Sequence, residues 1–234
     1  MSTAIILAGG LGTRLRSTVP DVPKPMAPIQ GRPFLEYQMD YWLAQGVKRF
    51  VLSIGYQYDV IMNHFGDSYK NAPLHYSIEK TPLGTGGGLL LAIQTLNNNN
   101  PFLVLNGDTF FEVSLPTFLD FHKSQGSEWT FALTRSNEKG RYMGIEVTEN
   151  GKILSLKSGT EQRGRFINSG VYCINPKVLQ QLEFNNGQKL SLEDDILPHL
   201  METSAKIYGI EFMKNFIDIG VPDDYVRAAT ILQN

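Results

Sequence analysis

Short apolar runs alternate with segments of helical spacing through the first half of the chain. Four of these runs predict buried strands, at residues 4–7, 50–54, 75–79 and 102–105. Three segments in which apolar residues recur every three or four positions predict amphipathic helices, at residues 34–45, 58–65 and 86–94. Strands and helices that alternate in this way form βαβ units, so the first half predicts a mostly parallel sheet.

The pattern changes in the second half of the chain. Further strands are predicted at residues 129–133, 141–148, 153–157 and 166–174, and helices at residues 176–182, 192–201 and 223–233. The dipeptide Asn150-Gly151 lies between two of these strands and predicts a hairpin with a type I′ turn. Neither a repeat nor a linker divides the 234 residues. We therefore expect residues 1–234 to form one domain, with a smaller subregion at about residues 135–184.

Composition and charge exclude several classes of protein. With 21 Lys+Arg against 23 Asp+Glu the net charge is -2, so the chain lacks the basic surface of a nucleic-acid binder. The single cysteine, Cys173, can form neither an intramolecular disulfide nor a Cys-rich zinc site. No apolar run approaches the ~18 residues of a membrane span, and the start lacks the features of a signal peptide. We expect a cytoplasmic protein without nucleic-acid or membrane partners.

A glycine-rich turn directly follows the first predicted strand, in the segment from Leu7 to Arg16 (LAGGLGTRLR). Its glycines let the backbone approach a ligand closely, so that successive N–H groups can point at phosphate oxygens. A Rossmann fingerprint would need a glycine where Leu15 stands, and a Walker loop would need Gly-Lys-Ser/Thr, which is absent. A flexible turn without a ligand stays open as the alternative.

A stiff, basic segment follows the glycine turn. Four prolines occur within nine residues, at positions 20, 23, 25 and 28, and they forbid a helix. Lys24 stands between two of them, which places a flexible cation on a rigid loop. Residues 1–35 carry four basic residues and one acid, so this segment is +3 in a protein of net charge -2. This local cluster predicts a site for an anion.

These motifs together resemble the signature of a known family. The glycine turn with Thr13 and Arg14, followed by Pro23-Lys24-Pro25, is similar to the sugar-1-phosphate nucleotidylyltransferases over nearly the whole chain. Within that family, residues 22–37 most resemble the D-glycero-D-manno-heptose 1-phosphate guanylyltransferases. The resemblance implies a Rossmann-like three-layer α/β/α sandwich with a mixed, mostly parallel sheet and a small sugar-binding cap at about residues 135–184.

The resemblance also implies a reaction. An NTP, expected to be GTP, and a sugar 1-phosphate, expected to be the heptose phosphate, would give an NDP-sugar and pyrophosphate for surface polysaccharide synthesis. Arg14 and Lys24 would be catalytic. The implied nucleotide-binding residues are Leu7, Ala8, Gly9, Gly10, Gly12, Thr13, Arg14, Gly84, Thr85 and Gly86. The implied residues for the sugar phosphate are Asn106, Gly144, Lys157 and Asn168.

Two aspartates are candidate ligands for Mg²⁺. Asp108 follows a buried strand, where ligands bind in open α/β sheets, although a turn aspartate is the alternative. Asp218 stands in an apolar strand pattern, where a carboxylate is costly to desolvate unless a positive group meets it. Two carboxylates together with substrate phosphates would suit Mg²⁺. The sequence alone leaves open whether they meet, but the resemblance implies that they do.

Several points stay open at this level. A Glu-Lys pair found after the hairpin in many family members is absent, so Lys157, Arg163 or Arg165 are the candidate cations for the sugar phosphate. The alternative substrates are dTTP or UTP with glucose 1-phosphate or an N-acetylated sugar 1-phosphate. A non-catalytic relative that binds a nucleotide sugar is the alternative from another class, and the chain can be a monomer or a homo-oligomer.

Overall fold

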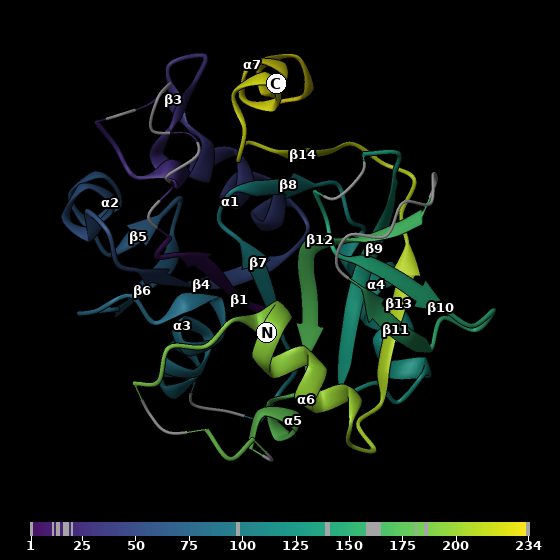
Figure 1. Ribbon diagram of the computed structural model, residues 1–234. Coiled ribbons are helices and arrows are strands. Elements are labelled where there is room, and N and C mark those ends of the chain that lie inside the picture. Colours follow the sequence, from purple (N-terminus) through teal and green to yellow (C-terminus); the bar gives the residue numbers. More distant parts are fainter. Residues whose placement is uncertain are drawn as a thin grey trace.

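The computed structural model describes residues 2–10, 12, 15, 19, 21–96, 99–138, 141–157, 165–180, 182–184 and 187–232. A ten-stranded mixed sheet forms the centre of this part of the chain (Figure 1). Its main path runs in the order β11-β10-β12-β7-β1-β4-β6-β5, with β9 against β12 and β13 against β9. The expected central sheet of mixed direction is therefore confirmed.

The first half of the chain supplies the parallel strands. They are β1 (Ser2–Ala8), β4 (Val47–Ile54), β6 (Ala72–Ile78) and β7 (Phe102–Asn106). β1 pairs in parallel with β4 on one side and β7 on the other, and β4 pairs in parallel with β6. The connecting helices are α1 (Phe34–Ala44), α2 (Tyr58–Phe65) and α3 (Gly84–Ala92), followed by the short 3-10 helix η2 (Ile93–Thr95). These elements confirm the predicted βαβ units.

The second half adds mostly antiparallel strands. They are β9 (Trp129–Ser136), β10 (Gly144–Val147), β11 (Ile153–Lys157), β12 (Arg165–Ile174) and β13 (Ile207–Glu211). The long strand β12 pairs antiparallel with β7, β9 and β10. β12 therefore joins the hairpin of β10 and β11 to the parallel half of the sheet.

The hairpin is confirmed, but its type I′ turn is wrong. A type I′ turn needs positive φ at both central residues. Gly151 has φ +83, whereas Asn150 is not among the residues with positive φ. The Gly151 N–H donates to Thr148 O at 2.9 Å, and Thr148 N donates to Lys152 O at 2.9 Å. The loop is thus a three-residue connection in which only the glycine adopts the left-handed conformation.

Several elements were not predicted. They are η1 (Lys24–Met26), β2 (Pro28–Ile29), β3 (Arg32–Pro33), β5 (Ser68–Tyr69), β8 (Thr109–Phe111), the ten-residue helix α4 (Leu115–Ser124) and β13. The apolar strand pattern around Asp218 corresponds to the short strand β14 (Phe216–Asp218). Two- and three-residue strands contain too little pattern to be recognised in a sequence. The last helical elements are α5 (Pro176–Gln180), the π-helical turn η3 (Leu192–Ile196), α6 (Leu197–Met201) and α7 (Pro222–Ile231).

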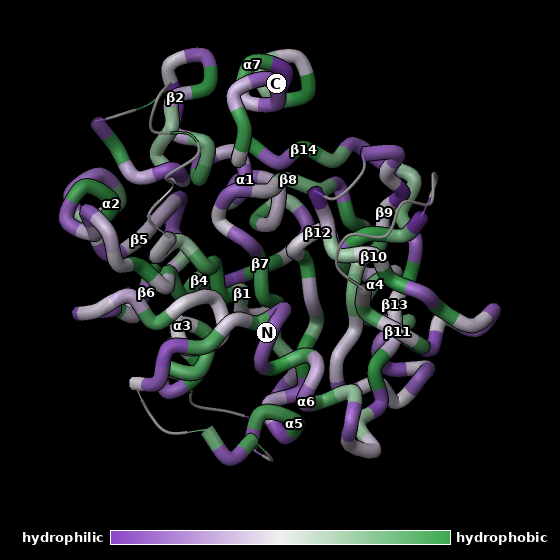
Figure 2. The backbone as a smooth tube through the Cα atoms, in the orientation of Figure 1, coloured by the Kyte–Doolittle hydropathy of each residue, from purple (hydrophilic) through white to green (hydrophobic). Residues whose placement is uncertain are grey.

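Successive residues of the central strand divide the core into two layers. Ile6 of β1 packs in a cluster with Trp42 of α1, whereas Ile5 packs in a second cluster with Leu89 of α3. Burying each such side chain contributes roughly 1.5–3 kcal/mol. Figure 2 shows hydrophobic stretches along the central strands and hydrophilic stretches in the outer loops. The expected α/β/α sandwich is therefore confirmed, and no described helix is long and apolar enough to cross a membrane.

Candidate active site

A pocket of about 430 Å³ lies where the parallel strands end. The carboxyl ends of parallel strands meet at one edge of the sheet, and β1 is the strand at which the chain order reverses, with β4 and β6 on one side and β7 on the other. The pocket is lined by residues at or after the ends of β1, β6 and β7, by two residues of η1 and by one residue from each of two later loops: Leu7, Ala8, Gly9, Gly10, Gly12, Lys24, Pro25, Glu79, Pro82, Gly84, Thr85, Gly88, Asn106, Gly107, Asp108, Lys189 and Gly220.

The glycine turn forms one wall of this pocket. A Cβ on Gly9 would collide with the carboxylate of Glu79, and Gly12 has φ +60, a conformation that side chains rarely adopt. A Cβ on Gly10 would meet no atom within 4 Å, so the backbone there faces open space. Leu7, Ala8 and these three glycines thus all line the pocket, and their contact with a nucleotide stays a prediction. Thr13 and Arg14 lie outside the described residues.

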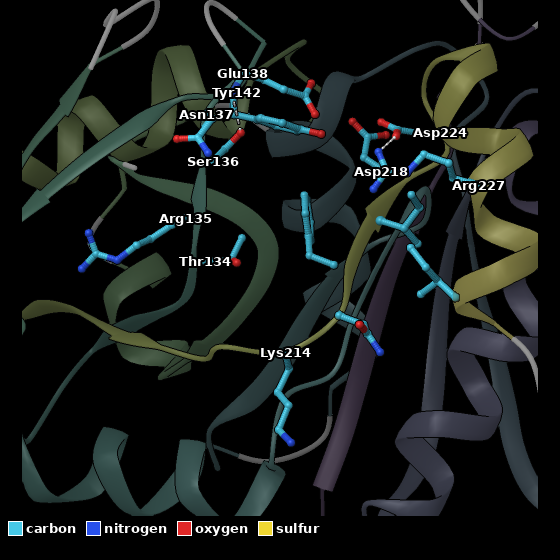
Figure 3. A pocket seen from close by; sticks show the side chains of 14 residues that line it. Thr134, Arg135, Ser136, Asn137, Glu138, Tyr142, Lys214, Asp218, Asp224 and Arg227 are labelled. Atoms are coloured by element: carbon cyan, nitrogen blue, oxygen red, sulfur yellow. Dashed lines mark hydrogen bonds and ion pairs between the residues drawn. The ribbon is translucent and has the colours of Figure 1, made fainter. Parts of the chain in front are cut away.

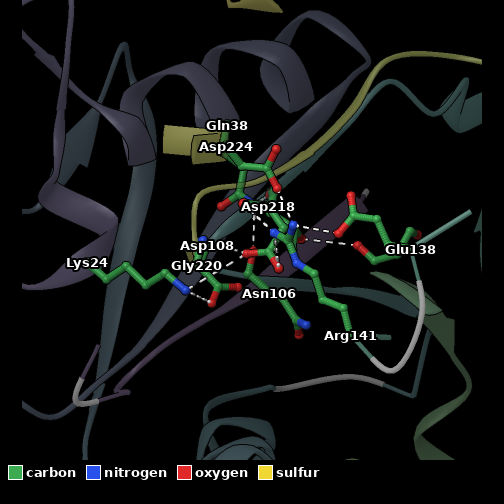
Figure 4. Close-up of polar contacts among 11 residues, drawn as sticks. Lys24, Gln38, Asn106, Asp108, Glu138, Arg141, Asp218, Gly220 and Asp224 are labelled. Carbon is green, nitrogen blue, oxygen red and sulfur yellow. Dashed lines mark hydrogen bonds and ion pairs between the residues drawn. The ribbon is translucent and has the colours of Figure 1, made fainter. Parts of the chain in front are cut away.

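Lys24 lies between the two predicted metal ligands. It begins the 3-10 helix η1 directly after Pro23, whose φ of -63 and ψ of 146 are extended. The Lys24 Nζ lies 2.5 Å from Asp108 Oδ2 and 3.9 Å from Asp218 Oδ1 (Figure 4). The lysine side chain is only 10% exposed. Asp108 and Asp218 are therefore brought to one ammonium group, although 110 residues, from 218 minus 108, separate them in the chain.

Strand pairing explains how Asp218 reaches the pocket. β14 pairs antiparallel with β8, and Asp218 stands opposite Thr109. The Ile219 N–H donates to Asp108 O at 3.0 Å, and the Gly220 N–H donates to Asp218 Oδ1 at 2.6 Å. Burial raises the pKa of Asp218, the charge of Asp108 raises it further, and Lys24 opposes both effects.

The donor set fits Mg²⁺ bound jointly by protein and substrate. Among the described residues, no group of three or more His, Cys, Asp or Glu side chains is placed to hold a metal ion. Asp108 and Asp218 supply two carboxylates beside an open pocket. Mg²⁺ prefers such oxygen ligands and commonly takes one or two carboxylates, with the remaining positions filled by water and phosphate.

The residues at the start of α3 make two kinds of contact, with the pocket and with later segments of the chain. Gly84 and Thr85 line the pocket. Gly86 does not line it, because it is buried under Leu190 and donates its N–H to Leu190 O at 2.8 Å. The Thr85 hydroxyl donates to Glu193 at 3.2 Å and accepts from Leu192 N at 2.9 Å. Thr85 therefore ties the pocket wall to η3.

The predicted sugar-phosphate residues lie in neighbouring strands. Gly144 of β10 pairs with Lys157 of β11 and with Ile167 of β12. Asn168 of β12 donates from Nδ2 to the Tyr172 hydroxyl at 2.7 Å. Asn106 lines the pocket, and its buried Oδ1 has no hydrogen-bond partner among the described residues. The four residues thus lie on β7, β12, β10 and β11, which are consecutive strands of the sheet.

The structure describes one of the two alternative cations for the sugar phosphate. Arg163 lies outside the described residues. Arg165 is buried, and its Nη2 donates to Tyr142 O at 3.2 Å and to Glu138 O at 3.4 Å. These bonds show that Arg165 supports the backbone at Glu138 and at Tyr142.

Sequence reasoning missed three polar residues of the site. Glu79 lines the pocket, and burial raises the pKa of its carboxyl group while hydrogen bonds from Leu83 N and Ser53 Oγ lower it. Lys189 lines the pocket from a later loop. Arg141 donates to Asp218 O at 3.0 Å and lies 3.2 Å from Asp218 Oδ2. Two of them had a signal: Glu79 follows a strand as Asp108 does, and Arg141 begins the segment that ends at the predicted Gly144.

A second pocket, of about 410 Å³, also borders Asp218 (Figure 3). Its cations do not converge, because Arg135 and Lys214 point in different directions and Arg227 pairs with Asp224 at 2.5 Å. Asp224 also pairs with Arg141, which itself contacts Asp218. The ion pairs at this second pocket therefore hold Asp218 in place.

The fold and this site are those of a transferase of nucleotidyl groups. The chain belongs to the nucleotidyl transferase family, whose model matches residues 3–234. This membership confirms the family, the fold and the class of enzyme expected from the sequence.

Three proteins are similar to this chain over nearly its full length. The D-glycero-alpha-D-manno-heptose 1-phosphate guanylyltransferase of Aneurinibacillus thermoaerophilus is 40% identical, over 99% of this chain and 98% of the relative. The enzyme of the same name from Campylobacter jejuni is 38% identical, over 95% of this chain and 96% of the relative. The crystal structure of HddC from Yersinia pseudotuberculosis has a TM-score of 0.87 at 33% identity and covers 100% of both chains. A complex of HddC with GMP-PN has a TM-score of 0.85.

Proposed function

We propose that this protein transfers the guanylyl group of GTP to D-glycero-α-D-manno-heptose 1-phosphate and releases pyrophosphate. Two relatives named for this activity match nearly the full chain, and a solved relative was complexed with GMP-PN. One observation in the structure carries the proposal: Lys24 lies between Asp108 and Asp218 at a pocket walled by glycines. Such a site suits two phosphorylated substrates and a divalent cation.

The reaction is a substitution at the α-phosphorus of GTP. A phosphate oxygen of the sugar 1-phosphate forms the new P–O bond. The bond from the α-phosphorus to the bridging oxygen breaks, and its electron pair leaves with pyrophosphate. Because no covalent intermediate is needed, the protein mainly positions the substrates and stabilises charge.

Each cationic or carboxylate group has a defined part in this proposal. Backbone N–H groups of the glycine turn and Arg14 hold the triphosphate, and Lys24 offsets the charge that develops on the α-phosphate. Asp108 and Asp218 would hold Mg²⁺. When bound, the ion acts as a Lewis acid that neutralises phosphate charge.

Glu79 suits guanine better than the other bases. A carboxylate accepts hydrogen bonds and donates none. The Watson–Crick edge of guanine presents two adjacent donors, N1–H and the 2-amino group, whereas uracil and thymine present one donor between two carbonyl oxygens. Glu79 lies on the pocket wall beside Gly9 and Gly88, and its oxygens are oriented by Leu83 N and Ser53.

The sugar would lie against the subregion at about residues 135–184. Asn106 and Asn168 carry side-chain amides that hydrogen-bond hydroxyl groups, and Asn106 Oδ1 is buried without a partner among the described residues. Lys157 ends β11 next to Gly144 and remains the candidate cation for the sugar phosphate.

The test is pyrophosphate release from a grid of NTPs and sugar 1-phosphates that includes manno-heptose, mannose and glucose. We expect GTP with the heptose phosphate to be the best pair. Removing one preorganised electrostatic group costs about 10²–10³ in turnover, so Lys24→Ala and Asp108→Ala should lose that much. Strong activity only with dTTP or UTP would contradict the guanylyl assignment. Release by no pair would favour the non-catalytic alternative.

A further inference from the structure

Gln38 is a buried polar residue on the core face of α1. Leu35, Met39 and Trp42 of the same helix pack in the core, and Gln38 lies among them with only 2% of its surface exposed. An amide at such a position costs stability unless its groups find partners. Its contacts therefore indicate why this position is not apolar.

Both hydrogen bonds of Gln38 go to the turn that carries Asp108. The Gln38 Nε2 donates to Asn106 O at 2.8 Å and to Thr109 O at 2.7 Å. These carbonyls lie on either side of Asp108 along the chain. Figure 4 shows Gln38 and Asn106 near the cluster of Asp108, Asp218 and Lys24.

The same turn is held at its other backbone groups. Gly107 N donates to Leu7 O at 2.9 Å, and Asp108 O accepts from Ile219 N at 3.0 Å. A Cβ on Gly107 would lie 2.7 Å from Leu7 O, so the turn has little room to shift toward β1. Gln38 therefore completes a set of bonds that fixes the backbone of the turn from β1, from the segment after β14 and from α1.

In the described part of the chain, only the amide nitrogen of Gln38 makes hydrogen bonds. Gln38 Oε1 is buried and has no hydrogen-bond partner there. An apolar side chain of the same length would remove this orphan acceptor, but it would also take the Nε2 donor from the carbonyls of Asn106 and Thr109. Nε2 is thus the half of the side chain that holds the turn.

We infer that Gln38 is a positioning residue that holds the Asp108 carboxylate where it can bind Mg²⁺ together with the triphosphate of the nucleotide. The inference rests on the proposed function, because it assigns Gln38 to the metal ligand of that reaction. A variant in which this carboxylate is displaced by an ångström would still fold, but it would bind the ion poorly.

The test compares variants of the full-length protein by calorimetric titration with GTP, in the presence and in the absence of MgCl₂. No sugar 1-phosphate is added, so no turnover occurs, and the readout is the factor by which Mg²⁺ tightens GTP binding. Gln38→Met removes the donors and keeps the length of the side chain. Gln38→Glu replaces the donating nitrogen with an oxygen that repels the two carbonyls.

Tyr41→Phe is the matched control. Tyr41 lies one turn further along α1, and its hydroxyl donates to Val113 O at 3.1 Å, away from the Asp108 turn. Tyr41→Phe therefore also removes a hydrogen bond from a side chain of α1 to a backbone carbonyl. Melting temperatures of all variants show how much of any effect comes from stability.

We expect Gln38→Met and Gln38→Glu to lower the Mg²⁺-dependent gain in GTP affinity at least fivefold and kcat about 10- to 100-fold. Tyr41→Phe should keep both within about twofold. If Asp108→Asn abolishes the gain while both Gln38 variants keep it, the inference is wrong and the proposed function stands. If Asp108→Asn leaves the gain unchanged, the metal assignment fails and takes the inference with it.

Discussion

Glu79 illustrates how the surroundings of one side chain determine what it can bind. Burial raises the pKa of its carboxyl group, while hydrogen bonds from Leu83 N and Ser53 Oγ favour the ionised form. The same two bonds orient both oxygens, and no room exists for a side chain at Gly9 or Gly88. The carboxylate is thus held in place against the pocket. This arrangement leads to a prediction about base selection.

Replacing Glu79 by Gln should weaken the preference for guanine. Hydrogen bonds to a charged group contribute about 1.5–3 kcal/mol, so kcat/KM for GTP should fall roughly 10- to 100-fold. Inosine triphosphate lacks the 2-amino group, so the wild-type protein should favour GTP over it, and Glu79→Gln should reduce that ratio.

Glu36→Gln is the control for this change, because Glu36 pairs with Arg32 and His64 and does not line the pocket. It should leave the GTP to ITP ratio unchanged. An unchanged ratio in Glu79→Gln would mean that another group reads the base.

A short strand brings the last part of the chain to the site. β14 has three residues, yet its pairing with β8 places Asp218 beside the Asp108 turn.

α3 lies against the segment around Leu190, because Leu190 N donates to Leu83 O at 2.8 Å and Leu190 O accepts from Gly86 N. The glycines at the start of α3 make this approach possible. We therefore expect α3 to be sensitive to added side chains.

Gly84→Ala should impair both stability and nucleotide binding. Gly84 has φ +72, and a Cβ there would collide with Leu190 O. The left-handed conformation alone costs a non-glycine residue roughly 1–2 kcal/mol, and the collision adds to it. Denaturant unfolding should show a loss above that range, and KM for GTP should rise because Gly84 lines the pocket.

Gly126→Ala measures the cost of the left-handed backbone conformation without a steric collision. Gly126 has φ +56, but a Cβ there would meet no atom within 4 Å. This variant should lose only the conformational cost and keep the wild-type KM. Equal losses in the two variants would show that the contact with Leu190 is easily relieved.

The sandwich buries a histidine between one of its helices and the central sheet. His122 of α4 is 5% exposed, and its Nδ1 lies 2.8 Å from Thr130 Oγ1 of β9. Burial lowers the pKa of this histidine. The unfolded chain therefore takes up a proton at a higher pH than the folded protein does. The stability that depends on neutral His122 is present above the unfolded pKa and is lost as the pH falls toward the folded pKa.

We predict that His122 lowers the free energy of unfolding as the pH falls from 7.5 to 5.5. Within the window between the two pKa values, this histidine costs about 1.4 kcal/mol for each pH unit. His122→Gln should lack this loss in denaturant titrations, and His199→Gln, at an exposed site, is the matched control. An equal slope in His122→Gln would assign the acid sensitivity to other groups.

The local pattern of the sequence determined most of the elements and part of the site. Apolar runs and helical spacing predict the main strands and helices, because side-chain periodicity reports which faces are buried. The glycine turn and Lys24 were found because their unusual composition constrains the backbone within a few residues. Asp108 was found because it follows a buried strand, where a parallel sheet places ligands.

Only the tertiary structure decided which distant groups meet. The pairing of β14 with β8 brings Asp218 to Lys24, and the packing of α1 brings Gln38 to the Asp108 turn. The type I′ turn was wrong because Asn-Gly permits this turn without requiring it. The periodicity of apolar residues indicates which face of an element is buried, but not which element packs against that face. Contacts between segments a hundred residues apart therefore leave no pattern in the sequence.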